Sequence, residues 1–305
     1  MGRHNMGFFS ELYGVMIPFS EQYDESMDLE LVRQACAGSR AAAERLSRAH
    51  QRFIYNVALK LVREPNDAAD LTQEVLVKML TRLSQYQGKS SFRTWLYRIV
   101  MNHFLSAKRS KTEKDIHSFD ELGAFVEEVH NNEDMNAEEK ETYKDHIITI
   151  RNKCMASTLL CLDRQQRMVL ILGGIFNIKS PVAAEILDMT PENFRQQLSR
   201  AKRDLFQFMD NKCGLINPNN PCRCHKKTKG FIREGKVDPQ SVQFTREARM
   251  TVGSMLDSKN HELDDLMEGK YLRLFTEQPY EDPEEDKLTQ YLLMDPDIKE
   301  LFYLN

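Results

Sequence analysis

The sequence predicts an all-α protein with several domains. Of its 305 residues, 41% are hydrophobic and 29% are charged, a globular composition with room for two or three cores. Apolar residues recur at helical spacing, and long alternation of Val, Ile and Thr is absent, so no sheet is expected. The longest apolar run, Met168 to Phe176, is about half of what a membrane span needs, so no transmembrane segment is expected either.

The first 26 residues form a leader whose status the sequence leaves open. The stretch 6–19 is apolar, but Glu11 interrupts it and no small-residue cleavage site follows, so a signal peptide is not expected. Six cysteines are too few for a disulfide scaffold in a chain of this length. Together these features predict a cytoplasmic protein.

Strong local segregation of charge lies behind the net charge of -4. Residues 87–111 carry six basic and no acidic residues, whereas 112–145 carry twelve acidic and three basic ones. A second basic block, 222–236, is followed by the acidic stretch 277–300. A basic block with interleaved aromatic residues is typical of nucleic-acid binding, and an acidic stretch without sustained apolar periodicity indicates a linker, here 111–152.

A first helical domain is predicted over 27–110. Its basic block contains Ser91 to Phe104, where aromatic and cationic side chains share one segment with the only Trp of the chain. Aromatic faces can stack on unpaired bases while Arg and Lys follow the phosphates, which suits single-stranded nucleic acid. We assign Phe92, Leu96, Ile99 and Val100 to the core. We expect Trp95, Tyr97 and the cations at the surface.

A second helical domain, 153–211, has helix-turn-helix spacing. Asp163 is expected to cap a helix that ends at Gly173 and Gly174, Ser180 to cap a short helix, and 188–190 to form the turn before the last helix. That last helix has one apolar face and one polar face. The polar face consists of Glu192, Arg195, Gln196, Ser199, Arg200 and Arg203. Such a face can contact base edges and phosphates in the major groove, although an ordinary amphipathic surface helix has the same pattern.

Two blocks of the sequence carry a family resemblance. Residues 65–75, PNDAADLTQEV, together with Phe92 to Ile99 and Asn102, resemble domain 2 of the extracytoplasmic-function bacterial sigma factors. Residues 162–167, LDRQQR, with 183–187 and 198–202, resemble domain 4 of the same group. The two blocks cover a little under half of the chain, and their order and the acidic linker between them agree with the family.

The resemblance implies a fold of two helical sigma domains and a role for each. Domain 2 would bind core RNA polymerase and melt and read the minus-ten promoter element, and domain 4 would read the minus-thirty-five element. The expected polymerase-binding residues are Asp67, Asp70, Gln73 and Glu74. The expected DNA-binding residues are Arg93, Trp95, Tyr97, Arg98, Asn102, Lys108 and Arg109 in the first domain, and Arg195, Gln196, Ser199, Arg200 and Arg203 in the second.

Three features depart from the family pattern. Ser106 stands where many relatives have an acidic residue, and 193–197, NFRQQ, differs from the usual recognition helix, so promoter preferences cannot be copied across. Most relatives also end soon after domain 4, whereas this chain continues as the extension 212–305. Residues 242–267 and 287–294 of the extension are expected to be helical, and the extension is expected to regulate the factor.

The extension begins with a cluster of candidate metal ligands, Cys213, Cys222, Cys224 and His225. Three thiols and an imidazole suit a tetrahedral zinc site, but the Cys-x-Cys spacing is unusual. Unligated thiols and a redox pair therefore stay open as alternatives. Cys36, Cys154 and Cys161 are expected in the core.

The function predicted is that of a sigma factor, with core RNA polymerase and promoter DNA as partners and an anti-sigma factor as a further one. No cofactor is required apart from the zinc considered for the extension. The alternative is a stand-alone helix-turn-helix regulator, which would leave the block 87–111 without a purpose. An enzyme is not expected, because no nucleophile, phosphate loop or His pair accompanies Asp67, Asp70 and Glu74.

Overall fold

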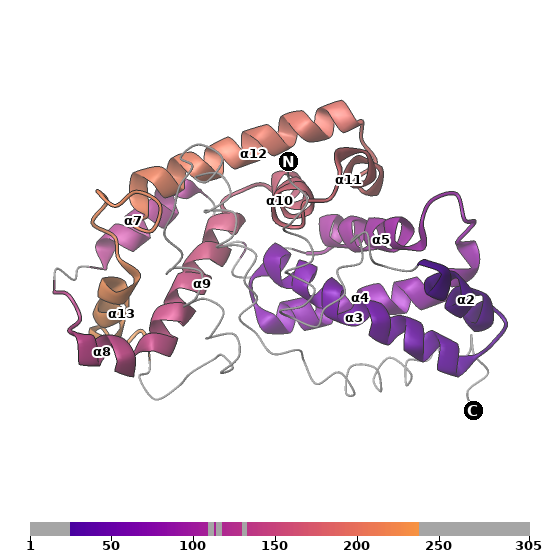
Figure 1. Cartoon of the computed structure of the whole chain (residues 1–305), viewed down its shortest axis with the longest axis horizontal. Helices are drawn as coiled ribbons and strands as arrows, with labels where there is room; N and C mark the ends of the chain where they lie inside the picture. The colour runs from indigo at the N-terminus through magenta and orange to yellow at the C-terminus, as the bar shows by residue number, and fades with distance from the viewer. Residues whose placement is uncertain (1–24, 109–112, 114–117, 130–132, 238–305) are drawn as a thin grey trace.

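The computed structural model describes residues 25–108, 113, 118–129 and 133–237 (Figure 1). It confirms the all-α prediction: across these ranges the one β feature is an isolated bridge between Cys213 and Cys222. The helices of the first half are α2 (Glu25–Cys36), α3 (Arg40–Val62), α4 (Pro65–Thr81), η1 (Leu83–Gln85) and α5 (Phe92–Ser106). Those of the second half are α7 (Phe119–Glu128), α8 (Ala137–Thr142), α9 (Lys144–Leu160), α10 (Arg164–Leu170), η2 (Ile171–Ile175), α11 (Ser180–Ile186), α12 (Pro191–Lys212) and α13 (Cys224–Arg233).

The helices α2, α3, α4 and α5 form one bundle. Helix α3 packs against α2 and α4, and α4 packs against α5. Local sequence sets their boundaries. Ser39 caps α3, and Pro65 occupies the first turn of α4, where no backbone N–H is needed. The Ser91 hydroxyl accepts the Thr94 N–H at 3.1 Å and so starts α5.

The helix-turn-helix predicted within 153–211 is present as α11 and α12. Asp163 and Gln166 form a capping box at the start of α10, as the Asp163 prediction required. Asp188 lies in the turn with a φ of 53°, and the Thr190 hydroxyl caps α12 by accepting the Asn193 N–H at 3.2 Å. Ser180 is the first residue of α11, but its side chain makes no capping bond.

Gly173 and Gly174 do not end their helix. The chain continues through them as the π-helical turn η2. The role of Gly173 is to allow close packing. A Cβ on Gly173 would lie 2.8 Å from side-chain atoms of both Leu198 and Phe194. The glycine therefore allows α12 to pack tightly over η2.

The segment 111–152, which we predicted as an acidic linker, is largely helical where the structure describes it. It contains α7, α8 and the first half of α9. Only a few apolar side chains hold these helices against the rest of the protein. Leu122 of α7 is buried, and the ring centroids of Phe119 on α7 and Phe208 on α12 lie 5.2 Å apart. That small number explains why no sustained apolar periodicity marks the segment.

One hydrophobic core runs through both helical domains, from α2 to the end of α12. Figure 1 shows α12 lying along one edge of the molecule, from α11 beside α5 to the group formed by α7, α9 and α13. No helix in the described ranges is long and apolar enough to cross a membrane. Residues 1–24 of the predicted leader and the helices predicted at 242–267 and 287–294 lie outside the described residues, and α2 already begins at Glu25, inside the predicted leader.

Candidate nucleic-acid and polymerase interface

The face of α12 predicted to read DNA is exposed as one surface. Its five side chains, Arg195, Gln196, Ser199, Arg200 and Arg203, are all solvent-exposed. The opposite face is anchored by Phe194, Ala201, Leu205 and Met209, which are buried. The cations are held only by weak exposed contacts, such as Arg195 with Glu192 at 3.6 Å, so they remain available to a ligand.

Helix α4 presents the acidic face predicted to bind polymerase. Asp70 and Glu74 are exposed, and Asp67 and Gln73 are half-buried on neighbouring turns. Glu74 also reaches α5, since its Oε2 lies 2.8 Å from Nε2 of His103. Burial and the charge of Lys78 lower the pKa of His103, while Glu74 opposes that shift. Only part of the acidic face is therefore free of internal contacts.

The residues predicted to bind DNA in α5 and just after it differ in their exposure. Asn102 and Lys108 are exposed, Trp95 and Arg98 are half-buried, and Arg109 lies outside the described residues. Trp95 rests on an aromatic platform, with ring centroids 5.6 Å from both Tyr86 and Phe92. Its indole is thus held by the bundle while part of it stays accessible.

Tyr97 and Arg93 are not at the surface as we expected. Tyr97 is fully buried, and its ring meets Phe53 edge to face at 5.0 Å, so it is a core residue in this arrangement. Arg93 is also buried. The cause is the helical period, because residues 93, 97 and 100 follow each other up the inner face of α5. Of the core assignments, Phe92, Leu96 and Val100 are buried and Ile99 is partly so.

The helix-turn-helix domain packs directly on the first bundle. Helix α11 lies against α5, and the Phe53 ring is 4.9 Å from the Phe176 ring that follows η2. Arg98 donates from Nη2 to the backbone oxygen of Glu185 on α11 at 2.7 Å. One of the predicted DNA-binding cations is therefore occupied by the other domain.

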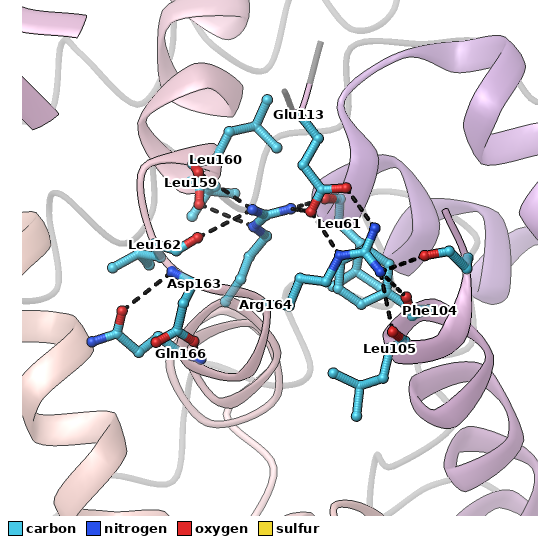
Figure 2. Close-up of polar contacts among 12 residues, drawn as sticks. Leu61, Phe104, Leu105, Glu113, Leu159, Leu160, Leu162, Asp163, Arg164 and Gln166 are labelled. Carbon is cyan, nitrogen blue, oxygen red and sulfur yellow. Dashed lines mark hydrogen bonds and ion pairs between the residues drawn. The ribbon is translucent and has the colours of Figure 1, made fainter. Parts of the chain in front are cut away.

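A buried charge cluster joins the two domains at the end of α5 (Figure 2). Arg164, at the start of α10, pairs with Glu113 through two bonds of 2.8 and 2.6 Å. Its Nη1 also donates to the backbone oxygens of Phe104, Leu105 and Ala107, at 2.6, 3.2 and 2.8 Å. These carbonyls have no partner within α5, so a residue of the second domain caps a helix of the first.

Arg167 extends this cluster into the core. Its guanidinium is buried, and Nη1 donates to the oxygen of Leu61 at the end of α3 at 2.5 Å and lies 3.2 Å from Glu113 Oε1. Burial lowers the pKa of Arg167 to about 10, which the negative charge of Glu113 opposes. The side chain therefore stays charged at neutral pH. It also binds the oxygens of Leu159, Leu160 and Leu162.

Sequence reasoning did not find this cluster. Arg164 and Arg167 lie in the block LDRQQR that carried the domain 4 resemblance, but nothing in the block says that they bond to the first domain. Glu113 was one of twelve acidic residues in the predicted linker. The available signal was weak: an acidic residue beside a basic block, with two Arg residues at helical spacing beyond it.

The basic start of the extension is bound by the acidic segment before α9. Lys227 donates to the backbone oxygen of Val129 at 2.7 Å, and Lys229 pairs with Glu139 at 3.0 Å. His225 Nε2 lies 2.7 Å from Asp134 Oδ1. Part of the charge segregation along the sequence is thus satisfied within the protein.

The Cys and His cluster of the extension is only partly as predicted. Cys213 and Cys222 face each other across the β-bridge, and Cys224 is the first residue of α13. His225 turns toward Asp134, and Cys154 of α9 lies near the three cysteines. Cys154 packs partly buried against the core and Cys161 is also partly buried, whereas Cys36, which was expected in the core too, is exposed.

Comparison with known proteins finds similarity to RNA polymerase sigma factors. The Sigma-70 region 2 description matches residues 46–114, which begin in the second turn of α3 and end one residue after Glu113. RNA polymerase sigma-H factor of Pseudomonas aeruginosa is 25% identical over 182 residues, which are 58% of this chain and 91% of that protein. RNA polymerase sigma factor YlaC of Bacillus subtilis is 28% identical over 56% of this chain and 93% of its own length. ECF RNA polymerase sigma-E factor of Escherichia coli K12 is 23% identical over 62% and 95%.

The chain carries a sigma-70 region 2 and is similar to the extracytoplasmic-function sigma factors. A solved structure of CnrH in complex with the cytosolic domain of CnrY is also similar, with 21% identity, coverage of 60% of this sigma factor and 97% of CnrH, and a TM-score of 0.43. The alignments with the three relatives span nearly all of those proteins but at most 62% of this sigma factor. A large part of this sigma factor therefore has no counterpart in them.

Proposed function

We propose that this sigma factor binds bacterial core RNA polymerase through the exposed acidic face of α4 and reads promoters with α5 and α12. The observation that carries the proposal is the single exposed face of α12. Five residues chosen from the sequence for DNA contact all lie on it, above a buried apolar stripe. Arg, Gln and Ser side chains so placed can reach base edges and phosphates in the major groove.

We assign a DNA contact to each predicted residue according to the exposure of its side chain. Trp95, on its aromatic platform, and the exposed Asn102 and Lys108 would meet the melted minus-ten strand. Arg195 and Gln196 near the start of α12 would read minus-thirty-five bases, and Arg200 and Arg203 would bind phosphates. The chain catalyses no reaction in this role, and it acts in the cytoplasm, where the polymerase is.

The contact between α11 and α5 supports a second step. While Arg98 is bonded to Glu185 and Arg164 caps α5, the two DNA-reading helices are held in one compact unit. In this proposal, polymerase binding separates the two domains so that each reaches its own promoter element. The free factor then binds duplex DNA weakly, and an anti-sigma factor could act by stabilising the compact form.

The experiment is run-off transcription from a promoter library with purified bacterial core polymerase, with and without the full chain. The proposal expects specific transcripts only when both components are present. Sequence-specific binding of duplex DNA by the protein alone, with no change in transcription by core polymerase, would instead support a stand-alone helix-turn-helix regulator.

A further inference from the structure

Four of the six cysteines converge where the extension leaves α12. Cys213 directly follows α12, Cys222 is its partner in the β-bridge, and Cys224 begins α13. Helix α13 packs against α9, which carries Cys154. All four cysteines are partly buried, and none forms a disulfide. Segments 60 residues apart in the sequence thus bring their thiols to one place.

The loop between Cys213 and Cys222 is built to hold this position. Gly214 donates its N–H to the Cys222 oxygen at 3.1 Å, and a Cβ on Gly214 would lie 2.2 Å from that oxygen, so only glycine fits. Arg223 also stabilises the loop, because it donates to the oxygens of Cys222 and Pro218 at 3.0 and 2.6 Å. The approach of the cysteines is therefore a feature of the backbone.

The identity of the fourth thiol follows from where two side chains point. His225 has its Nε2 2.7 Å from the Asp134 carboxylate, and that contact ties it to the segment before α8. Cys154 instead lies on α9, the helix against which α13 packs, and its thiol interacts electrostatically with Cys213, Cys222 and Cys224. The cluster is thus a set of four sulfurs, and the histidine beside it has another partner.

The chemistry of four gathered thiols favours a metal over a redox pair. The four thiols come from α9, the end of α12, the loop and the start of α13, and none of them is paired in a disulfide. A soft divalent cation binds several thiolates at once, and four sulfur ligands are typical of tetrahedral structural zinc.

We propose that Cys154, Cys213, Cys222 and Cys224 bind one Zn²⁺ as a tetrahedral thiolate site. Each thiol gives its proton to water as its sulfur binds the ion. Within the described residues no group of three or more His, Cys, Asp or Glu side chains is arranged to hold a metal ion as it stands, so zinc binding requires the four sulfurs to move closer together. The ion would tie α13, and with it the start of the extension, to α9 and to the end of the recognition helix.

The test is the metal content of the full chain, purified anaerobically without chelator and measured by inductively coupled plasma mass spectrometry. The wild-type protein should contain about one equivalent of zinc. Cys154→Ser and Cys224→Ser should lose most of it. Cys161→Ser is the matched control, because Cys161 lies at the end of the same helix as Cys154 but donates its thiol to the Ser118 oxygen at 3.3 Å. It should keep its zinc, as should His225→Ala.

A second measurement guards against variants that merely misfold. Co²⁺ exchanged into the wild-type protein should give the strong visible bands and sulfur charge-transfer absorption of a tetrahedral four-thiolate site. In Cys154→Ser these bands should weaken while the helical circular dichroism is kept. Wild-type protein with far less than one equivalent of metal would overturn the proposal. Zinc retained by Cys154→Ser but lost by His225→Ala would overturn the ligand set and restore the histidine.

Discussion

Arg164 binds both carboxylate oxygens of Glu113, at 2.8 and 2.6 Å, while its third nitrogen caps the last carbonyls of α5. The pair is almost completely buried. Arg164 thus fixes the position of the helix-turn-helix domain relative to the end of α5, the helix predicted to melt promoters. We therefore expect Arg164 and Glu113 to help hold the free factor in its compact form.

Glu113→Gln tests this junction through stability and its pH dependence. Removing one partner of a buried charge network costs about 3–5 kcal/mol, because Arg164 and Arg167 lose their counter-charge. Burial raises the pKa of Glu113, but the hydrogen bonds and charges of the two arginines outweigh it, and the net shift is downward. A carboxylate with a lowered pKa stabilises the fold fully above its unfolded pKa and loses that effect as pH falls through its folded value.

The wild-type free energy of unfolding, from urea denaturation, should therefore drop more than that of Glu113→Gln when the pH is lowered from 7 to 4. Glu138→Gln is the control. Because Glu138 is exposed on α8, this substitution should change neither the free energy of unfolding at pH 7 nor its decrease at pH 4. If the closed form weakens DNA binding, Glu113→Gln should also bind duplex DNA more tightly without polymerase. Equal pH dependence of the two proteins would remove Glu113 from this role.

Asp70→Lys should abolish co-purification with core polymerase and leave the helical circular dichroism unchanged, because Asp70 is exposed on α4. Glu74→Lys should do the same, but it also removes the contact with His103 and so costs some stability. Glu138→Lys on α8 makes the same charge change elsewhere. If Glu138→Lys weakened polymerase binding as much as Asp70→Lys, net charge and not the α4 face would be responsible.

Trp95→Ala should reduce open-complex formation by about 1–3 kcal/mol, the value of one lost base stack, while core binding stays near normal. Permanganate footprinting on closed and premelted promoters separates a melting defect from a binding defect. If only melting is impaired, a premelted promoter should restore the yield of open complex. Tyr97→Ala is the contrasting variant. Because Tyr97 is buried against Phe53, its loss should lower the stability of the whole fold by about 3–5 kcal/mol. Normal stability for Tyr97→Ala would contradict its burial.

Arg195→Ala should change the preferred minus-thirty-five sequence in a promoter selection, with a cost of about 1–3 kcal/mol on the original motif. Arg203→Ala should weaken binding to all sequences alike and lower the salt slope by about 1, the signature of a phosphate contact. Both side chains are exposed, so neither change should unfold the domain. An unchanged motif after Arg195→Ala would refute the assignment.

Truncation after residue 237 tests the regulatory role of the extension. The shortened chain keeps α13, whose Lys227 and Lys229 bind the segments around α7 and α8, and it keeps the four cysteines. Transcription output should change while the preferred promoter sequence stays the same. Identical output from the truncated and full-length factors at equal occupancy of core polymerase would assign no regulation to residues 238–305.

Local sequence was sufficient for most helices of the two predicted domains and for the surface of α12. Asp163, Thr190 and the 3.6-residue period of 194–209 act over a few residues, so caps, turn and exposed face could be predicted without tertiary contacts. The identity of the family was likewise contained in short blocks of sequence. The helical segments in the predicted linker were missed because so few apolar residues anchor them.

Tertiary structure decided what depends on distant partners. Whether Tyr97 stacks on a base or fills a core depends on Phe53, 44 positions earlier in the chain, and period alone does not orient α5 in its bundle. Arg167 could be predicted as a cation, but its burial against Leu61 depends on the docking of one domain on another. Cys154 joined the cysteine cluster for the same reason: a helix face acquires its chemistry from whichever segment folds back onto it, and that contact is not encoded in local spacing.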